Sequence, residues 1–164
     1  MEEKSLNDLR NYCLVLYVLY AISAVLQFSE ALMLMGIITL LVAYVATGAR
    51  KKAAIGTTYA SHLRWMLRTF WIGTGVIVPV AVLIATGLIL HFTDILGLAD
   101  RMSSDDPEAL AAAIQNYMQL NGQKITLIML LTVAPSIIWW LRRCWVGYAR
   151  AKVGQEIKNV TSWL

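Results

Sequence analysis

Four stretches of this chain, each at least 17 residues long, contain no Asp, Glu, Lys or Arg. They run over 11–29, 31–49, 69–93 and 125–141. A bilayer core about 30 Å thick is crossed by ~20 apolar helical residues, and all four stretches come close to that length. The pattern predicts an all-α membrane protein with four transmembrane helices, at about 11–29, 31–49, 70–92 and 124–141. We expect residues 1–164 to form a single integral membrane domain.

The composition argues against the alternative of a soluble protein with four buried core helices. The chain is 59% hydrophobic and 15% charged, whereas a soluble domain usually carries about 25% charged residues. Too few charges remain to cover a water-exposed surface. The first stretch is predicted to be a retained helix rather than a cleaved signal peptide, because Glu2, Glu3 and Asp8 stand where a basic leader would be expected.

The basic residues fall almost entirely on one side of the predicted helices. Only Arg101 and Lys124 lie on the opposite side, together with six acidic residues. Because positively charged short loops stay in the cytoplasm, this split predicts that both termini are cytoplasmic. The twelve cations of the predicted cytoplasmic side are Lys4, Arg10, Arg50, Lys51, Lys52, Arg64, Arg68, Arg142, Arg143, Arg150, Lys152 and Lys158.

The segment between the second and third spans is predicted to contain a helix that lies in the membrane interface. Residues 57–69 repeat apolar side chains at helical spacing, and Arg64 and Arg68 share the opposite side. Such a helix can place its apolar stripe in the acyl chains while its cations face water. We therefore predict a cytoplasmic interfacial helix at 57–69 that bends at Gly73 and Gly75 into the third span.

The loop between the third and fourth spans is predicted to contain a periplasmic amphipathic helix at 106–120. A capping-box spacing from Asp105 to Glu108 marks its start. The sequence Asn121-Gly122 marks its end, because both residues are common where a helix terminates. We expect this helix to lie on the outer rim and to pack its apolar stripe on the bundle or on lipid.

Each of the third and fourth predicted spans contains one proline, Pro79 and Pro135. A proline inside a helix removes a backbone donor and clashes with the preceding turn, so each residue is expected to kink its helix. Paired kinks at similar depth could enclose a small cavity, and they could equally serve packing alone. We favour the packing interpretation.

A repeated string supplies the main candidate site. Residues 65–73 and 139–147 share five of nine positions, and both copies are predicted to lie at the cytoplasmic interface. Trp and Arg both favour this layer, so generic anchoring is one interpretation. The other is a basic-aromatic collar that binds anionic lipid headgroups or a partner. Its candidate residues are His62, Arg64, Trp65, Arg68, Trp71, Arg142 and Arg143.

Other chemistry finds little support in the sequence. Glu30 is a candidate ion or proton site, but it is expected at a turn where a carboxylate meets headgroups and water. His62 and His91 lie 29 helical residues apart, roughly 43 Å if straight, too far for one haem. Ser61 and His62 have no positioned acid, and the spacing of the two cysteines is not that of metal ligands. We therefore predict no metal, no cofactor, no catalytic residues and no nucleic-acid partner.

The stretch from Tyr59 to Trp71 resembles a Ser-His-x-Arg-x-x-x-Arg-Thr-Phe-Trp motif found in a group of small bacterial inner-membrane proteins. Some members of that group are related to the four-helix membrane subunit of the chloroplast import translocon. A weaker pattern of an aromatic, an Arg and a Gly, with a later Gly-x-x-Ile, is approximated over residues 143–157. The resemblance implies a bacterial inner (plasma) membrane protein and adds weight to His62, Arg64 and Arg68. The long acidic outer loop departs from the pattern.

Together these features predict a non-enzymatic accessory or assembly protein of the inner membrane that binds anionic lipid or a membrane partner, which includes a second copy of itself. The alternative is a small oligomeric transporter or channel, although Gln27 and Glu30 would line a pathway thinly. An enzyme acting on lipid is a third possibility that lacks a convergent set of acid and base residues.

Overall fold

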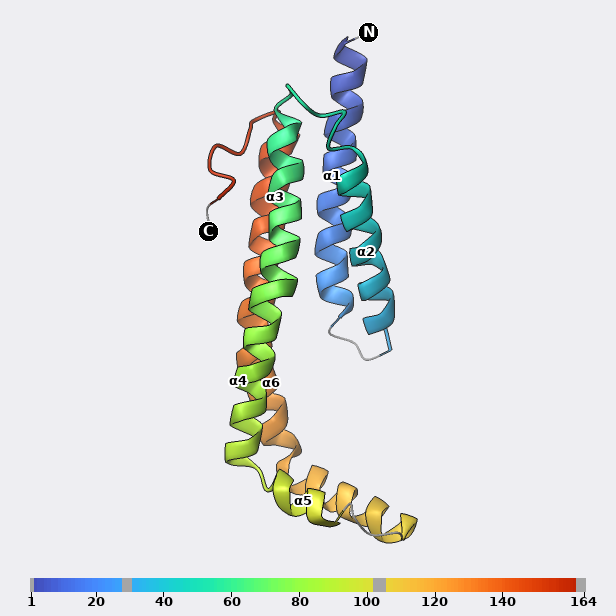
Figure 1. The fold of residues 1–164 in the computed structure, drawn as a ribbon, viewed down its shortest axis with the longest axis vertical. Helices are drawn as coiled ribbons and strands as arrows, with labels where there is room; N and C mark the ends of the chain where they lie inside the picture. Colours follow the sequence, from blue (N-terminus) through green and yellow to red (C-terminus); the bar gives the residue numbers. More distant parts are fainter. Residues whose placement is uncertain (1, 28–30, 102–105, 162–164) are drawn as a thin grey trace. The chain divides into compact units, whose positions relative to one another are not determined.

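The computed structural model describes residues 2–27, 31–101 and 106–161, and within them it contains helices and connecting turns but no strand (Figure 1). The all-α prediction is confirmed. In chain order the elements are α1 (Glu2–Leu26), α2 (Met33–Ala49), α3 (Tyr59–Ile72), the π-helical segment η1 (Gly73–Ile77), α4 (Val78–Phe92), α5 (Ile95–Arg101) and α6 (Pro107–Lys152).

Three helical stretches in the described part of the chain are long and apolar enough to cross a membrane: Ser5–Leu26, Tyr59–Phe92 and Pro107–Lys152. The apolar helix α2 is shorter, at 17 residues, or ~26 Å. Large apolar side chains are widely exposed, including Leu34 at 67% and Leu83 at 71%. Contiguous apolar surface on this scale is unfavourable in water and is solvated by lipid. The chain therefore has the helices of a membrane protein.

The chain divides into two compact units, residues 1–76 with 137–164, and residues 77–136. In the first unit, α1 packs on α2 through a face of α2 that recurs every three or four residues and includes Gly36, Leu40, Ala43 and Thr47. Small residues on that face let two helix backbones approach closely. A hydrogen bond from the Tyr12 hydroxyl to the Ala46 carbonyl, at 2.7 Å, joins the same two helices.

The second unit contains α4, α5 and the first part of α6. The Thr93 and Tyr117 hydroxyls lie 2.7 Å apart and join the end of α4 to α6. At the start of α6, an Asp106 carboxylate oxygen accepts a hydrogen bond from the Glu108 N–H at 3.0 Å, which caps the helix. The predicted helix start is thus confirmed, with Asp106 as the cap; Asp105, proposed for that role, lies outside the described residues.

The predicted interfacial helix at 57–69 and the predicted span at 70–92 form one uninterrupted helical stretch. At Gly73 and Gly75, where a bend was predicted, the structure has the π-helical segment η1, which ends two residues before Pro79. A proline offers no N–H to the carbonyl four residues earlier and crowds it, and a π turn accommodates the mismatch.

The prediction of a separate helix at 106–120 that ends at Asn121-Gly122 is wrong. α6 runs without interruption through that pair and through the predicted span at 124–141 as far as Lys152. The Asn121 amide donates to the Tyr117 carbonyl at 3.3 Å and so caps nothing. A glycine that ends a helix adopts a positive φ, and Gly122 does not.

Candidate functional site

Helix α3 separates the candidate residues onto two faces. His62, Trp65 and Thr69, spaced by three and four residues, are buried, whereas Arg64 is exposed and Trp71 is 60% exposed. This is the pattern of a helix that packs one side against neighbouring helices. The motif from Tyr59 to Trp71 therefore contributes some residues to the interior of the first unit and others to its surface.

Arg143 on α6 is the largest fully buried side chain of the described residues, with 1% exposure. Its guanidinium carbon lies 3.4 Å from the ring centre of Trp65, and its Nε donates to the Thr69 hydroxyl at 2.9 Å. The Trp65 indole N–H donates in return to the Arg143 carbonyl at 3.2 Å. A guanidinium is planar and weakly hydrated, so it is the cation best suited to stacking on an indole inside a packed core.

His62 is completely buried and joins three parts of the chain. Its Nε2 lies 2.8 Å from the Gln155 carbonyl, and its Nδ1 lies 3.0 Å from the Tyr17 hydroxyl. Because a carbonyl only accepts, Nε2 carries a proton and donates it, and in the neutral ring Nδ1 accepts from Tyr17. The adjacent Ser61 hydroxyl accepts the Ile157 N–H at 3.0 Å.

The segment that His62 and Ser61 hold is positioned by the end of α6. Gly154 has a φ of 70°, and its N–H donates to the Ala151 carbonyl. The Gln155 N–H donates to the Arg150 carbonyl. These two bonds form a Schellman motif, which reverses the chain and presents the Gln155 carbonyl to the histidine. The Ser-His pair thus anchors the C-terminal segment, a contact role that requires no catalytic acid.

We expect the change His62→Phe to release the C-terminal segment while the helices remain folded. The phenyl ring fills the same space but makes neither hydrogen bond, each contributing about 1 kcal/mol. Amide hydrogen exchange at residues 155–158 should accelerate by about tenfold. The exposed histidine offers a control, because His91→Phe should leave that exchange unchanged. Unaltered protection in the His62 variant would show that the Schellman motif and the Ser61 hydrogen bond hold the segment without the histidine.

The repeated string also places two glycines against aromatic rings. Gly73 lies directly against the Trp140 ring, and Gly147 lies directly against the Tyr17 ring. The Trp140 indole N–H donates to the Tyr20 carbonyl at 3.0 Å. The start of η1 and helix α1 therefore each approach α6 at a position where no side chain larger than hydrogen fits without movement.

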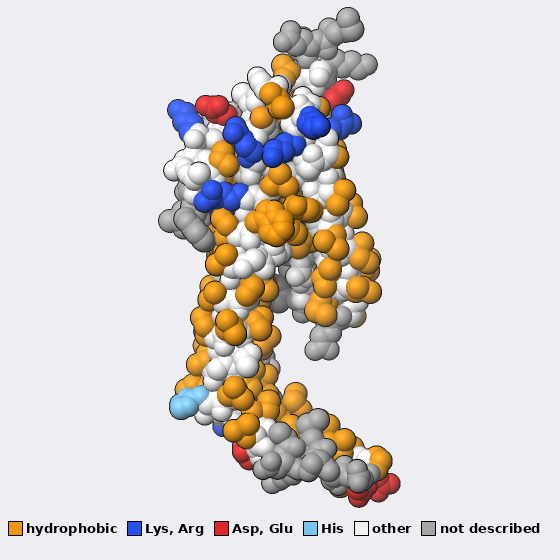
Figure 2. Space-filling model, viewed as in Figure 1, with side chains coloured by type: hydrophobic (Ala, Val, Ile, Leu, Met, Phe, Trp, Pro, Cys, Tyr) orange, Lys and Arg blue, Asp and Glu red, His pale blue; other side chains and the backbone are white. Residues whose placement is uncertain are grey.

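The surface of the first unit carries a group of cations at the end where α1 begins and α6 ends. Figure 2 shows their Lys and Arg side chains above a mainly apolar surface. Arg64 and Arg142 are exposed, and Arg68 is half-buried with an Nε that has no hydrogen-bond partner among the described residues. Trp71 and Trp145 are 60% and 69% exposed. The other exposed cations among the side chains that the structure describes in this unit are Arg50, Lys51, Lys52, Arg150, Lys152 and Lys158.

The seven residues predicted for the collar thus divide by location. Arg64, Trp71 and Arg142 are exposed and Arg68 is half-buried, whereas His62, Trp65 and Arg143 face the interior. Their part in lipid or partner binding stays a prediction. Glu30, the candidate ion site, lies outside the described residues.

Sequence reasoning missed the partners of the buried residues: Tyr17, Thr69 and the Gln155 carbonyl. The sequence could have indicated two of these partners only through helical spacing, because Tyr17 and Thr69 stand at the spacing of nearby apolar residues. The free thiols of Cys13 and Cys144 are also buried in this unit. Within the described ranges, no three His, Cys, Asp or Glu side chains come together as a metal site would require.

No protein-family model, curated protein or solved structure matches the chain. The resemblance to the bacterial inner-membrane group accordingly stays a prediction.

Proposed function

We propose that this chain is a four-span protein of the bacterial inner membrane, with both termini in the cytoplasm. It serves as a non-enzymatic accessory or assembly protein that binds anionic lipid headgroups through a basic-aromatic collar. We define the collar by its surface residues, Arg64, Arg68 and Arg142 with Trp71 and Trp145. A membrane partner that presents acidic groups would engage the same cations.

The observation that carries this proposal is the exposure of guanidinium groups beside exposed indoles in one unit. Arg64 and Arg142 directly precede Trp65 and Arg143, whose stacking brings α3 and α6 together at this level. Indoles partition to the membrane interface, and cations near an anionic leaflet each gain about 1 kcal/mol of attraction. All twelve cations predicted for the cytoplasmic side belong to the first unit, whereas Arg101 and Lys124 belong to the second.

The buried residues give the collar a fixed support. Arg143 and Trp65 hold α3 against α6, so that the guanidinium groups on the two helices keep a constant spacing. Preorganised cations lose less side-chain entropy on binding than cations on independent loops. In this proposal the buried residues of the first unit position the collar, and the surface residues of the collar bind the anionic headgroups.

We expect the double change Arg64→Gln and Arg142→Gln to lower the enrichment of anionic lipid about thirtyfold, the factor that corresponds to two cations at ~1 kcal/mol each. The measurement is the ratio of phosphatidylglycerol to phosphatidylcholine retained by the protein after extraction from vesicles that contain equal amounts of both. Lys51→Gln with Lys52→Gln removes the same charge at the same end of the unit and should change the ratio less than about twofold. An equal fall of this ratio in both double variants would show that net charge alone enriches the anionic lipid. A ratio unchanged by the Arg64 and Arg142 substitutions would contradict the proposal.

A further inference from the structure

An apolar groove of about 330 Å³ lies between α1 and the last part of α6, within the first unit. Val18 and Ala21 line it from α1, and Leu141, Trp145 and Tyr148 line it from α6. The buried Tyr17 and Cys144 complete its lining. The volume falls within the range of about 300–1,000 Å³ that is typical of small-molecule sites.

The two walls of the groove continue to cations at the same end. One face of α1 carries Arg10 and, four, seven and eleven residues later, Leu14, Tyr17 and Ala21. One face of α6 carries residues at the same spacing: Leu141, Trp145, Tyr148 and Lys152. Each stripe therefore ends in a single positive charge beyond its apolar residues.

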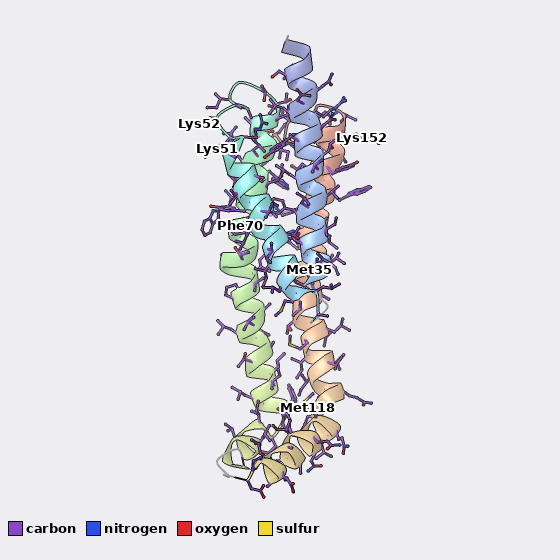
Figure 3. All side chains as sticks on the ribbon, turned by 90° about the vertical axis from the view of Figure 1, so that its right-hand side faces the viewer. Met35, Lys51, Lys52, Phe70, Met118 and Lys152 are labelled. Carbon is purple, nitrogen blue, oxygen red and sulfur yellow. The ribbon has the colours of Figure 1, made fainter. Side chains whose placement is uncertain are left out.

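Contacts between the helices place the two cations at a similar height. Tyr20 pairs with Trp140 and Tyr17 with Gly147, so α1 and this part of α6 run antiparallel. Arg10 lies seven residues before Tyr17, about 10 Å along the axis, and Lys152 lies five residues after Gly147, about 8 Å in the same direction. Figure 3 shows Lys152 beside α1 at the end of the unit where Lys51 and Lys52 lie.

We propose that this groove binds one anionic phospholipid, with an acyl chain along the apolar walls and the phosphate between Arg10 and Lys152. The inference rests on the proposed function and names its ligand more closely: a specific lipid site on α1 and α6, which shares Trp145 with the collar but uses different cations. An acyl chain matches a long, open, apolar surface, and a phosphodiester matches two cations at one end of it. A second copy of the chain could fill this site only if it placed an apolar helix in the groove and an acidic group between the two cations at the same time.

The test uses the full-length protein in bilayer nanodiscs that contain phosphatidylglycerol with a photoactivatable diazirine on its acyl chain. Phosphatidylcholine with the same modified chain serves as the comparison probe. After irradiation, mass spectrometry measures the labelling of residues 14–21 and 141–148. We expect labelling by the phosphatidylglycerol probe to exceed labelling by the phosphatidylcholine probe about thirtyfold, since two cations attract the net negative charge and each corresponds to about fivefold.

Two variants examine the two halves of the site. Arg10→Gln with Lys152→Gln should lower phosphatidylglycerol labelling to the level of phosphatidylcholine, because the half-buried Arg10 and the exposed Lys152 both lose their positive charge. Ala21→Phe fills the groove and should lower labelling by both probes about fivefold or more. Lys51→Gln with Lys52→Gln is the charge-matched control and should leave the labelling of both peptides unchanged.

The outcomes separate the groove from the collar. Labelling that survives the Arg64→Gln and Arg142→Gln double change but falls in the Arg10 and Lys152 double variant supports a separate groove site. Equal labelling by both probes, or labelling unaffected by Ala21→Phe, overturns the proposal of a lipid site in the groove. That result would stand even if the collar variants still showed reduced enrichment of anionic lipid. Absence of lipid adducts from both peptides with either probe would likewise overturn the groove proposal.

Discussion

Replacing Arg143 by Ala should lower the free energy of unfolding by about 3 kcal/mol. The change removes a buried guanidinium that stacks on Trp65 at 3.4 Å and donates to Thr69 at 2.9 Å. A desolvated cation–π contact contributes about 2 kcal/mol and a hydrogen bond from a charged donor about 1.5–3 kcal/mol. The cavity adds a cost similar to that of other large-to-small core changes, and relief from desolvating the charge offsets part of the total.

Arg142 provides the matched control, because it is the preceding residue, has the same side chain and is exposed. Arg142→Ala should change the free energy of unfolding by less than about 0.5 kcal/mol. Arg143→Lys retains the charge but lacks the planar fork, so it should remain within about 1 kcal/mol of Arg143→Ala. The measurement is a detergent unfolding titration followed by tryptophan fluorescence. Full recovery in the Lys variant would show that charge, rather than stacking geometry, makes the contribution.

The helices were predictable because long apolar stretches and helical spacing act locally. A stretch such as 31–49 leaves few alternatives to a helix, and α2 lies inside it. The continuation of α6 through Asn121-Gly122 was not predictable in this way. Asn and Gly end a helix only when the glycine turns to positive φ, and in this chain the apolar sequence that follows continues the helix through the pair.

The buried polar contacts were beyond sequence reasoning for a different reason. An Arg beside tryptophans near a membrane interface ordinarily faces headgroups, and nothing in residues 139–147 distinguishes Arg142 from Arg143. The distinction arises because the helical turn of 100° per residue points only Arg143 at Trp65 and Thr69 on α3. Those partners lie 78 and 74 positions away in the chain, so the choice depends on tertiary packing.

The two glycines of the repeated string should be equally intolerant of a single added methyl group. Gly73→Ala and Gly147→Ala each place a Cβ inside the space of an aromatic ring, Trp140 and Tyr17 respectively. Rings in a packed core move only together with their neighbours: Trp140 is hydrogen-bonded to the Tyr20 carbonyl, and Tyr17 to His62. We expect each variant to lose about 2 kcal/mol of unfolding free energy, within the range for overpacked cores.

Two other helical glycines separate this steric effect from helix propensity. Gly75 in η1 and Gly122 in α6 have no neighbouring atoms where a Cβ would lie. Gly75→Ala and Gly122→Ala should therefore be neutral or stabilising, by up to about 1 kcal/mol, since alanine favours a helix over glycine. Thermal unfolding of the four variants in the same detergent measures the difference. If Gly147→Ala were as stable as Gly122→Ala, α1 and α6 could separate without loss, and the groove between them would lack the fixed walls that a lipid site requires.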